Sequence, residues 1–210
     1  MTSSSSETAR PRAWQRMLSG RRLDLLNPSP DDIAIEDIAH GLARVARWNG
    51  QTIGEHAFSV AQHSVLVDDI VAKIAPNQLA VIRQAALLHD APEYVVGDLI
   101  SPFKAAIGFD YKTFEERLLE AIHHRFSLPY PLPQDMRDAI KKADRIAAFH
   151  EAIALAGFDF NEACQCFGPE PSLPQDLTEH LSGLEAMPVA EAQAAFLSRH
   201  VSLLAATKPD

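Results

Sequence analysis

Apolar residues recur at helical spacing along almost the whole chain, and this periodicity constrains the fold more than any other feature of the sequence. The segment from Ile35 to Trp48 is typical, because its apolar residues form one helical stripe and Asn49-Gly50 follows as a breaker. The alternation of apolar and polar residues that is typical of strands is almost absent. The sequence therefore predicts an all-α fold, a single helical globule of about seven helices.

The breakers also predict where the helices lie. The segment 157–174, GFDFNEACQCFGPEPSLP, reads as a long loop, and SLPYPLPQD reads as a proline-rich connector. We expect helices at about residues 35–48, 55–74, 78–89, 111–126, 135–156, 175–184 and 188–204.

The length of 210 residues suits one domain with a small appendage. The opening MTSSSSETARPRAW is rich in serine and threonine, so we expect a partly disordered N-terminal tail over residues 1–20. Residues 21–160 would then form the main domain, and residues 161–210 a helical extension that packs on it.

The formal net charge of −9 argues against nucleic acid polymers and acidic membranes as partners, because both need a basic face. A small phosphorylated ligand is still compatible, since a few local cations or a metal can hold a phosphate on an acidic protein. The N-terminus has no apolar signal region, and no stretch approaches the ~18 apolar residues of a membrane span. Cys164 and Cys166 read as thiols in a reducing cytosol, so we expect a cytoplasmic protein, and a homodimer is compatible with the sequence.

The stretch LLHDAPEYVVGDLISP, residues 87–102, is an apolar run that ends in two polar side chains, His89 and Asp90. Glu93 and Asp98 follow within the same stretch. Burying an imidazole and a carboxylate without partners is costly. Either they pair with each other and the backbone, or a cation lies beside them.

Two further places in the chain hold metal-type ligands in apolar helical contexts. His63 lies in VAQHSVLV, and Asp144 lies in KKADRIAAFHE. Together with His89 and Asp90 they form a mixed nitrogen and oxygen set, which suits one divalent ion with room for water. Each residue alone would be ordinary. The set leaves the ion open among Mn, Co, Fe, Ni, Zn and Mg.

The order His63, His89-Asp90, Asp144 resembles the HD-domain metal-dependent phosphohydrolase superfamily. HDAPEYVVGDLISPFK is similar to a stretch of its bacterial 5′-deoxynucleotidase-like branch, and residues 21–50 with FSVAQHS resemble a related branch of uncharacterised or phage-associated HD hydrolases. The resemblance covers roughly residues 20–155. It implies an all-α HD domain whose ligands converge on one divalent ion, and the hydrolysis of a phosphomonoester, most often of a nucleotide.

The resemblance also implies roles for single residues. His63, His89, Asp90 and Asp144 match the metal ligands, Glu93 matches the catalytic glutamate, and Asp98 matches an aspartate near substrate and metal. Substrate-binding roles are implied for two cations, Arg47 and Lys104, and for a further histidine, His56.

Two positions leave alternatives open. His56 and His63 are seven residues apart, so on one helix they would share a face, and either could be the first ligand. We choose His63, because VAQHS is the local match in the closer branch. Glu151 follows Asp144 by seven residues and either supports the site or is a surface charge, of which we favour the surface.

The sequence therefore predicts a metal-dependent phosphohydrolase that acts on a (deoxy)nucleoside 5′-monophosphate or a similar small nucleotide. An HD hydrolase for cyclic, triphosphate or signalling nucleotides is one alternative. A non-hydrolytic nucleotide-binding regulator and a purely structural helical module are two others. The complete ligand set together with Glu93 argues against the regulator, because a degenerate site would have lost a member. In a purely structural module, buried metal ligands would have no evident use.

Overall fold

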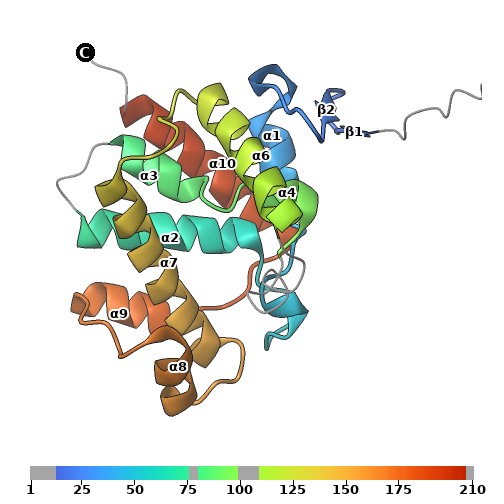
Figure 1. Cartoon of the computed structure of the whole chain (residues 1–210). Coiled ribbons are helices and arrows are strands. Elements are labelled where there is room, and N and C mark those ends of the chain that lie inside the picture. The colour runs from blue at the N-terminus through green and yellow to red at the C-terminus, as the bar shows by residue number, and fades with distance from the viewer. Residues whose placement is uncertain (1–12, 76–79, 99–108, 207–210) are drawn as a thin grey trace, which may run out of the picture.

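The computed structural model describes residues 13–75, 80–98 and 109–206, and these residues are mainly helical (Figure 1), which confirms the predicted all-α fold. A two-stranded antiparallel sheet pairs β1 (Trp14–Arg16) with β2 (Arg22–Asp24), and short 3-10 helices cover Pro30–Asp32 and Arg47–Gly50. The α-helices of the described residues are α1 (Ile35–Leu42), α2 (Val60–Ile74), α3 (Ala80–Leu87), α4 (Glu93–Val96), α6 (Phe109–Arg125), α7 (Gln134–Ala154), α8 (Phe160–Phe167), α9 (Gln175–Ser182) and α10 (Val189–Ala206).

Helix α2 lies at the centre of the bundle and packs against α3, α7 and α10 (Figure 1). Apolar residues on several sides of α2 are completely buried, among them Val60, Val67 and Ile70. Removing such side chains from water is the main favourable contribution to folding. A polar side chain on α2 is therefore either paired inside the core or directed at a functional site.

Two predicted boundaries are wrong, each for a local reason. Helix α1 ends at Leu42 rather than near residue 48, because the chain turns into the short helix at Arg47–Gly50. Helix α2 begins at Val60 rather than near residue 55, because the Ser59 side chain accepts a hydrogen bond from the amide of Gln62 and caps the helix there. His56 therefore lies before α2 and does not share a helical face with His63.

The segment 157–174 is not a continuous loop, because it contains α8. Asp159 and Glu162 form a reciprocal capping box, in which each side chain accepts a hydrogen bond from the other residue's amide. Gly168, with φ of 91°, ends the helix. Ala163 on the inner face is buried, so α8 covers part of α7.

Helix α10 closes the bundle against α1, α2 and α3. Its Arg199 forms an ion pair with Asp68 of α2. Asp68 is fully buried and also pairs with Arg83 of α3. No helix among the described residues is both long and apolar enough to cross a membrane. The division into tail, main domain and C-terminal extension stays a prediction.

A close contact between α1 and α4 helps to position the site. A Cβ atom added at Gly41 of α1 would lie 2.7 Å from Cβ and 3.0 Å from the carbonyl oxygen of Tyr94 on α4. Only glycine allows the two backbones to approach this closely. Helix α4 begins at Glu93, so this contact sets the position of Glu93.

Candidate metal centre

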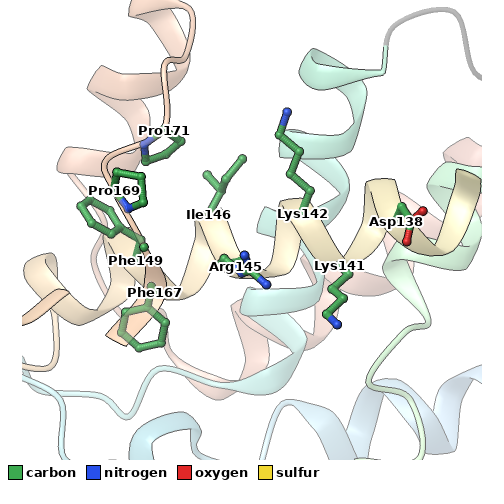
Figure 2. Close-up of a pocket in the computed structure, with 10 residues that line it drawn as sticks. Asp138, Lys141, Lys142, Arg145, Ile146, Phe149, Phe167, Pro169 and Pro171 are labelled. Carbon is green, nitrogen blue, oxygen red and sulfur yellow. The ribbon is translucent and has the colours of Figure 1, made fainter. Parts of the chain in front are cut away.

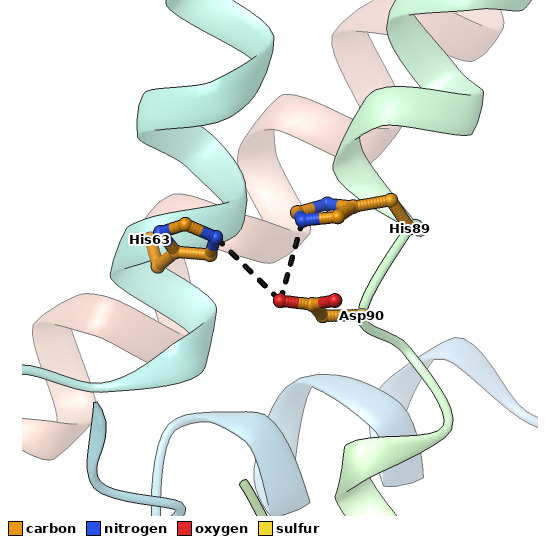
Figure 3. A group of neighbouring side chains, drawn as sticks. All are labelled: His63, His89 and Asp90. Carbon is orange, nitrogen blue, oxygen red and sulfur yellow. Dashed lines mark ion pairs between the residues drawn. The ribbon is translucent and has the colours of Figure 1, made fainter. Parts of the chain in front are cut away.

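Three helices bring the predicted metal ligands together. His63 comes from α2, His89 and Asp90 follow the end of α3, and Asp144 comes from α7. One ligand atom from each of His63, His89 and Asp90 lies within 4.8 Å of the others, and Figure 3 shows the three side chains converging. The sequence placed these residues in separate helices, and the fold gathers them at one point.

Asp144 completes the cluster. Its Oδ1 lies 3.3 Å from Nε2 of His63 and 4.0 Å from Nε2 of His89. Oδ2 of Asp90 lies 3.5 Å and 3.2 Å from the same two nitrogens. Two imidazole nitrogens thus face two carboxylates at ion-pair distance.

Hydrogen bonds on the far side of each ring fix both imidazoles. Nδ1–H of His89 donates to the carbonyl oxygen of Ala86 at 2.8 Å, and Nδ1–H of His63 donates to Oε1 of Glu151 at 2.5 Å. Each Nε2 therefore points into the cluster, as in histidines that bind metals through Nε2. Both Nε2 atoms are buried, and neither makes a well-formed hydrogen bond within the described part of the chain.

Such buried nitrogens are costly unless an ion or a proton satisfies them. His63, His89 and Asp90 could hold a divalent metal ion, and Asp144 lies where it could add a fourth ligand. The donor set of two nitrogens and two oxygens fits a transition metal.

The electrostatics of the cluster favour positive charge. Burial and the Arg47 charge lower the pKa of His63, but the carboxylates of Glu151 and Asp144 outweigh them and raise it to about 10. Burial raises the pKa of Asp90, but the neighbouring histidines, His89 above all, and Arg47 hold it well below its usual range. A divalent ion at this point would compete with protons for the two Nε2 atoms.

Arg47 and Glu151 form a second layer behind the cluster. Nε and Nη2 of Arg47 donate to Oε2 of Glu151 at 3.3 and 3.1 Å, and Nη1 lies 3.7 Å from Asp90. Glu151 is fully buried, so the expectation that it is a surface charge is wrong. Burial raises the pKa of Glu151, but Arg47 and His63 together lower it to about 2. Its seven-residue spacing from Asp144 was the signal for this inward position.

Trp48 is a site residue that sequence reasoning missed. Its Nε1–H donates to Oε2 of Glu151 at 3.0 Å, and its ring packs edge-on against Phe158 and Phe167 at 5.6 and 5.9 Å. Its φ of 57° and ψ of 27° lie in the left-handed region, which costs a bulky residue on the order of 1–3 kcal/mol. These contacts hold Trp48, and with it the neighbouring Arg47, in this unfavourable conformation.

The other predicted site residues lie at different distances from the cluster. Glu93 begins α4, is 2% exposed, and its amide donates to the carbonyl oxygen of Asp90. Asp98 follows α4 and is half-buried. Burial of Arg47 lowers the pKa of Arg47, and Asp98 is among the acidic groups that raise it. His56 lies in a bend before α2, and the structure does not place it in the cluster. Lys104 lies outside the described residues.

A pocket of about 370 Å³ adjoins the cluster, because His89 and Asp144 form part of its wall. Its apolar wall comes mainly from α6, α7 and the segment between them, and two cations, Arg137 and Lys141, also line it. The apolar and aromatic residues of this wall include Leu119, Tyr130, Leu132 and Ile140.

A helical domain that gathers His, His-Asp and Asp from three helices in this order is an HD-type domain. The family model described as 5′-deoxynucleotidase YfbR-like matches residues 39–165, which include the whole cluster. The chain belongs to this family.

Two relatives extend the comparison. The chain is 56% identical to an uncharacterized protein of Rhodobacter capsulatus over 194 residues, which cover 92% of this chain and 96% of that protein. It is 35% identical to YfdR, an uncharacterized protein of Escherichia coli, over 131 residues, which cover 62% of this chain and 66% of YfdR.

Proposed function

We propose that the protein is a metal-dependent phosphohydrolase that removes the phosphate from a (deoxy)nucleoside 5′-monophosphate or a similar small nucleotide. The observation that carries this proposal is the convergence of His63, His89, Asp90 and Asp144 beside a half-buried arginine, Arg47. The membership of the family implies a hydrolase and supports the reaction class.

The four ligands would hold one divalent ion, of which Mn, Co, Fe, Ni, Zn and Mg remain candidates. When bound, such an ion supplies a Lewis acid that activates water and offsets charge on a phosphoryl group. Nδ1–H of His63 and of His89 keeps each ring oriented, because each donates to a fixed acceptor.

Arg47 would bind the phosphoryl oxygens. Burial lowers the pKa of Arg47, but Glu151 and Asp90 raise it above its usual value, so the side chain stays charged. Glu151 occupies Nε and Nη2 and leaves Nη1 directed towards Asp90 and the cluster. A guanidinium placed in this way stabilises the charge that spreads over the phosphoryl oxygens in the transition state.

Glu93 would transfer the proton between the attacking water and the leaving oxygen. Its backbone is tied to Asp90, and its carboxyl group is almost completely buried, which suits a general acid or base. Asp98, near Arg47, would contribute to catalysis beside the substrate. His56 and Lys104 stay predicted substrate contacts.

The pocket beside His89 and Asp144 is where we place the nucleoside. Its volume of about 370 Å³ and its apolar and aromatic wall suit a planar base. The substrate would then lie with its phosphate at the metal centre. A cytoplasmic location stays a prediction from the two thiols.

A phosphate-release screen tests the proposal. Nucleoside 5′-monophosphates, cyclic nucleotides and nucleoside triphosphates would each be assayed with each candidate metal. We expect release from 5′-monophosphates, and its loss in Asp90→Ala. Release from the other classes alone would favour the alternative HD hydrolase, and binding without release would favour the regulator.

A further inference from the structure

A second pocket of about 400 Å³ lies between α7 and the segment that follows α8. Its α7 residues lie on a different face of the helix from Asp144 and Glu151, which face the metal centre. Figure 2 shows Lys142 and Lys141 pointing to opposite sides of α7, with Arg145 nearer to the aromatic rings, which gather at one end. The pocket is thus separate from the metal centre, although Lys141 lines both pockets.

The cationic side of this pocket is unusual in a chain of net charge −9. Lys141, Lys142 and Arg145 are exposed and lie within about one turn of α7, and none has an ion-pair partner among the described residues. Asp138, the acidic residue of the lining, accepts a hydrogen bond from Gln134 at 2.8 Å. Lys142 and Arg145 are three residues apart and therefore neighbours on the surface of α7, and a bound anion would offset their like charges.

The other side of the pocket is apolar and aromatic. Phe149 is 2% exposed and packs edge-on against Phe160, with ring centroids 6.1 Å apart. Phe167 is half-buried, and Pro169 and Pro171 follow it in the wall. Fixed rings beside cations suit a ligand that combines a planar ring with negative charge.

The aromatic side of the pocket touches the layer behind the metal centre. The ring of Phe167 lies 5.9 Å from that of Trp48. Trp48 donates to the same Oε2 of Glu151 that binds Arg47. A ligand that moves Phe167 would therefore move a neighbour of the residues that position Arg47.

We propose that this pocket is a second binding site, for a small organic anion with a planar ring of the nucleoside phosphate class, and that its occupancy is linked to the metal centre through Phe167 and Trp48. The binding step does not depend on the proposed phosphohydrolase activity. If no phosphohydrolase activity were found, binding at the second site could therefore still be tested by itself.

Calorimetric titration of the full chain with ATP tests the site. We expect the double variant Lys142→Glu, Arg145→Glu to weaken ATP binding by about tenfold or more, because two charge-assisted contacts become repulsive. Arg125→Glu is the matched control, since Arg125 is exposed on α6 and lines neither pocket. Absence of ATP binding to the wild type, or equal weakening in the control, would overturn the proposal.

Two further titrations locate the ligand. Arg47→Gln should weaken this ATP binding much less than the double variant does, because Arg47 does not line the pocket. If Arg47→Gln abolishes binding while the double variant retains it, ATP binds at the metal centre and the second site is refuted. Inorganic tripolyphosphate should bind more weakly than ATP, and equal affinity would refute the part of the proposal that concerns the planar ring.

The link to the metal centre has its own readout. In a Trp14→Phe background, Trp48 is the one remaining tryptophan of the sequence. We expect saturating ATP to change the emission of Trp48, and the double variant to lose this change. Calorimetric binding at the second pocket without any change in Trp48 emission would overturn the link.

Discussion

Glu93 is the residue whose removal separates catalysis from metal binding. It is buried at the start of α4 and is not one of the four proposed ligands. We expect Glu93→Gln, which keeps the shape of the side chain, to retain the metal and lower kcat by about 10²–10⁴-fold. Steady-state kinetics with elemental analysis of the same sample checks this. A variant with full metal and near-native kcat would show that Glu93 does not transfer the proton.

Glu151 is a second single residue whose removal is informative, because it acts on the cluster through its neighbours. It orients His63 and balances the charge of Arg47. We expect Glu151→Gln to weaken metal affinity by about 10–100-fold, as is typical when the hydrogen-bond partner of a ligating histidine is changed. Metal titration of the refolded apo protein measures this. Glu191→Gln, at an exposed position, is the control, and equal affinities in the two variants would contradict the role.

The sequence located the residues of the cluster better than the residues behind it. Each proposed ligand is a metal-type side chain in or beside an apolar helix, so pattern and resemblance find it. The spacing of Glu151 from Asp144 was a signal, but its position depends on Arg47, which lies far from it in the chain, and Trp48 carries no metal-type side chain. A buried carboxylate is favourable only once its cation is in place, and only the fold brings the two together.

At the scale of the elements, the close packing of α1 on α4 sets the position of Glu93. We expect Gly41→Ala to lower the free energy of unfolding by about 1–3 kcal/mol and to reduce kcat, because its Cβ would force α4 to move. Gly183→Ala is the control, since its added Cβ would lie 3.6 Å from its nearest neighbour. Denaturant unfolding and steady-state kinetics of both variants test this expectation. A Gly41→Ala enzyme with native kcat would refute the positioning role.

Among the elements, the sequence predicted the long helices well and the short ones poorly. Helices α2, α7 and α10 have enough turns for their apolar periodicity to stand out. Helix α8 has eight residues and lies between Gly157 and Gly168, so the breakers hid its capping box. The first turn predicted for α2 was wrong because Ser59, and not the apolar pattern, determines where the helix begins.

At the scale of the whole molecule, Asp68 joins α2, α3 and α10 through one buried carboxylate. We expect Asp68→Ala to lower the free energy of unfolding by about 2–4 kcal/mol, because Arg83 loses its buried partner and Arg199 keeps only Asp69. Asp176→Ala, which removes the exposed Lys73–Asp176 pair, should change stability little. Denaturant unfolding compares the two, and equal effects would contradict a structural role for Asp68.

The central claim is that four residues from three helices hold one divalent ion, and the metal content of purified protein tests it most directly. We expect about one divalent ion per chain in the wild type and in His56→Ala, and almost none in Asp90→Ala or His63→Ala. Circular dichroism of each variant excludes unfolding as the cause of metal loss. Equal metal content in the wild type and Asp90→Ala, or loss of metal in His56→Ala with retention in His63→Ala, would contradict the account.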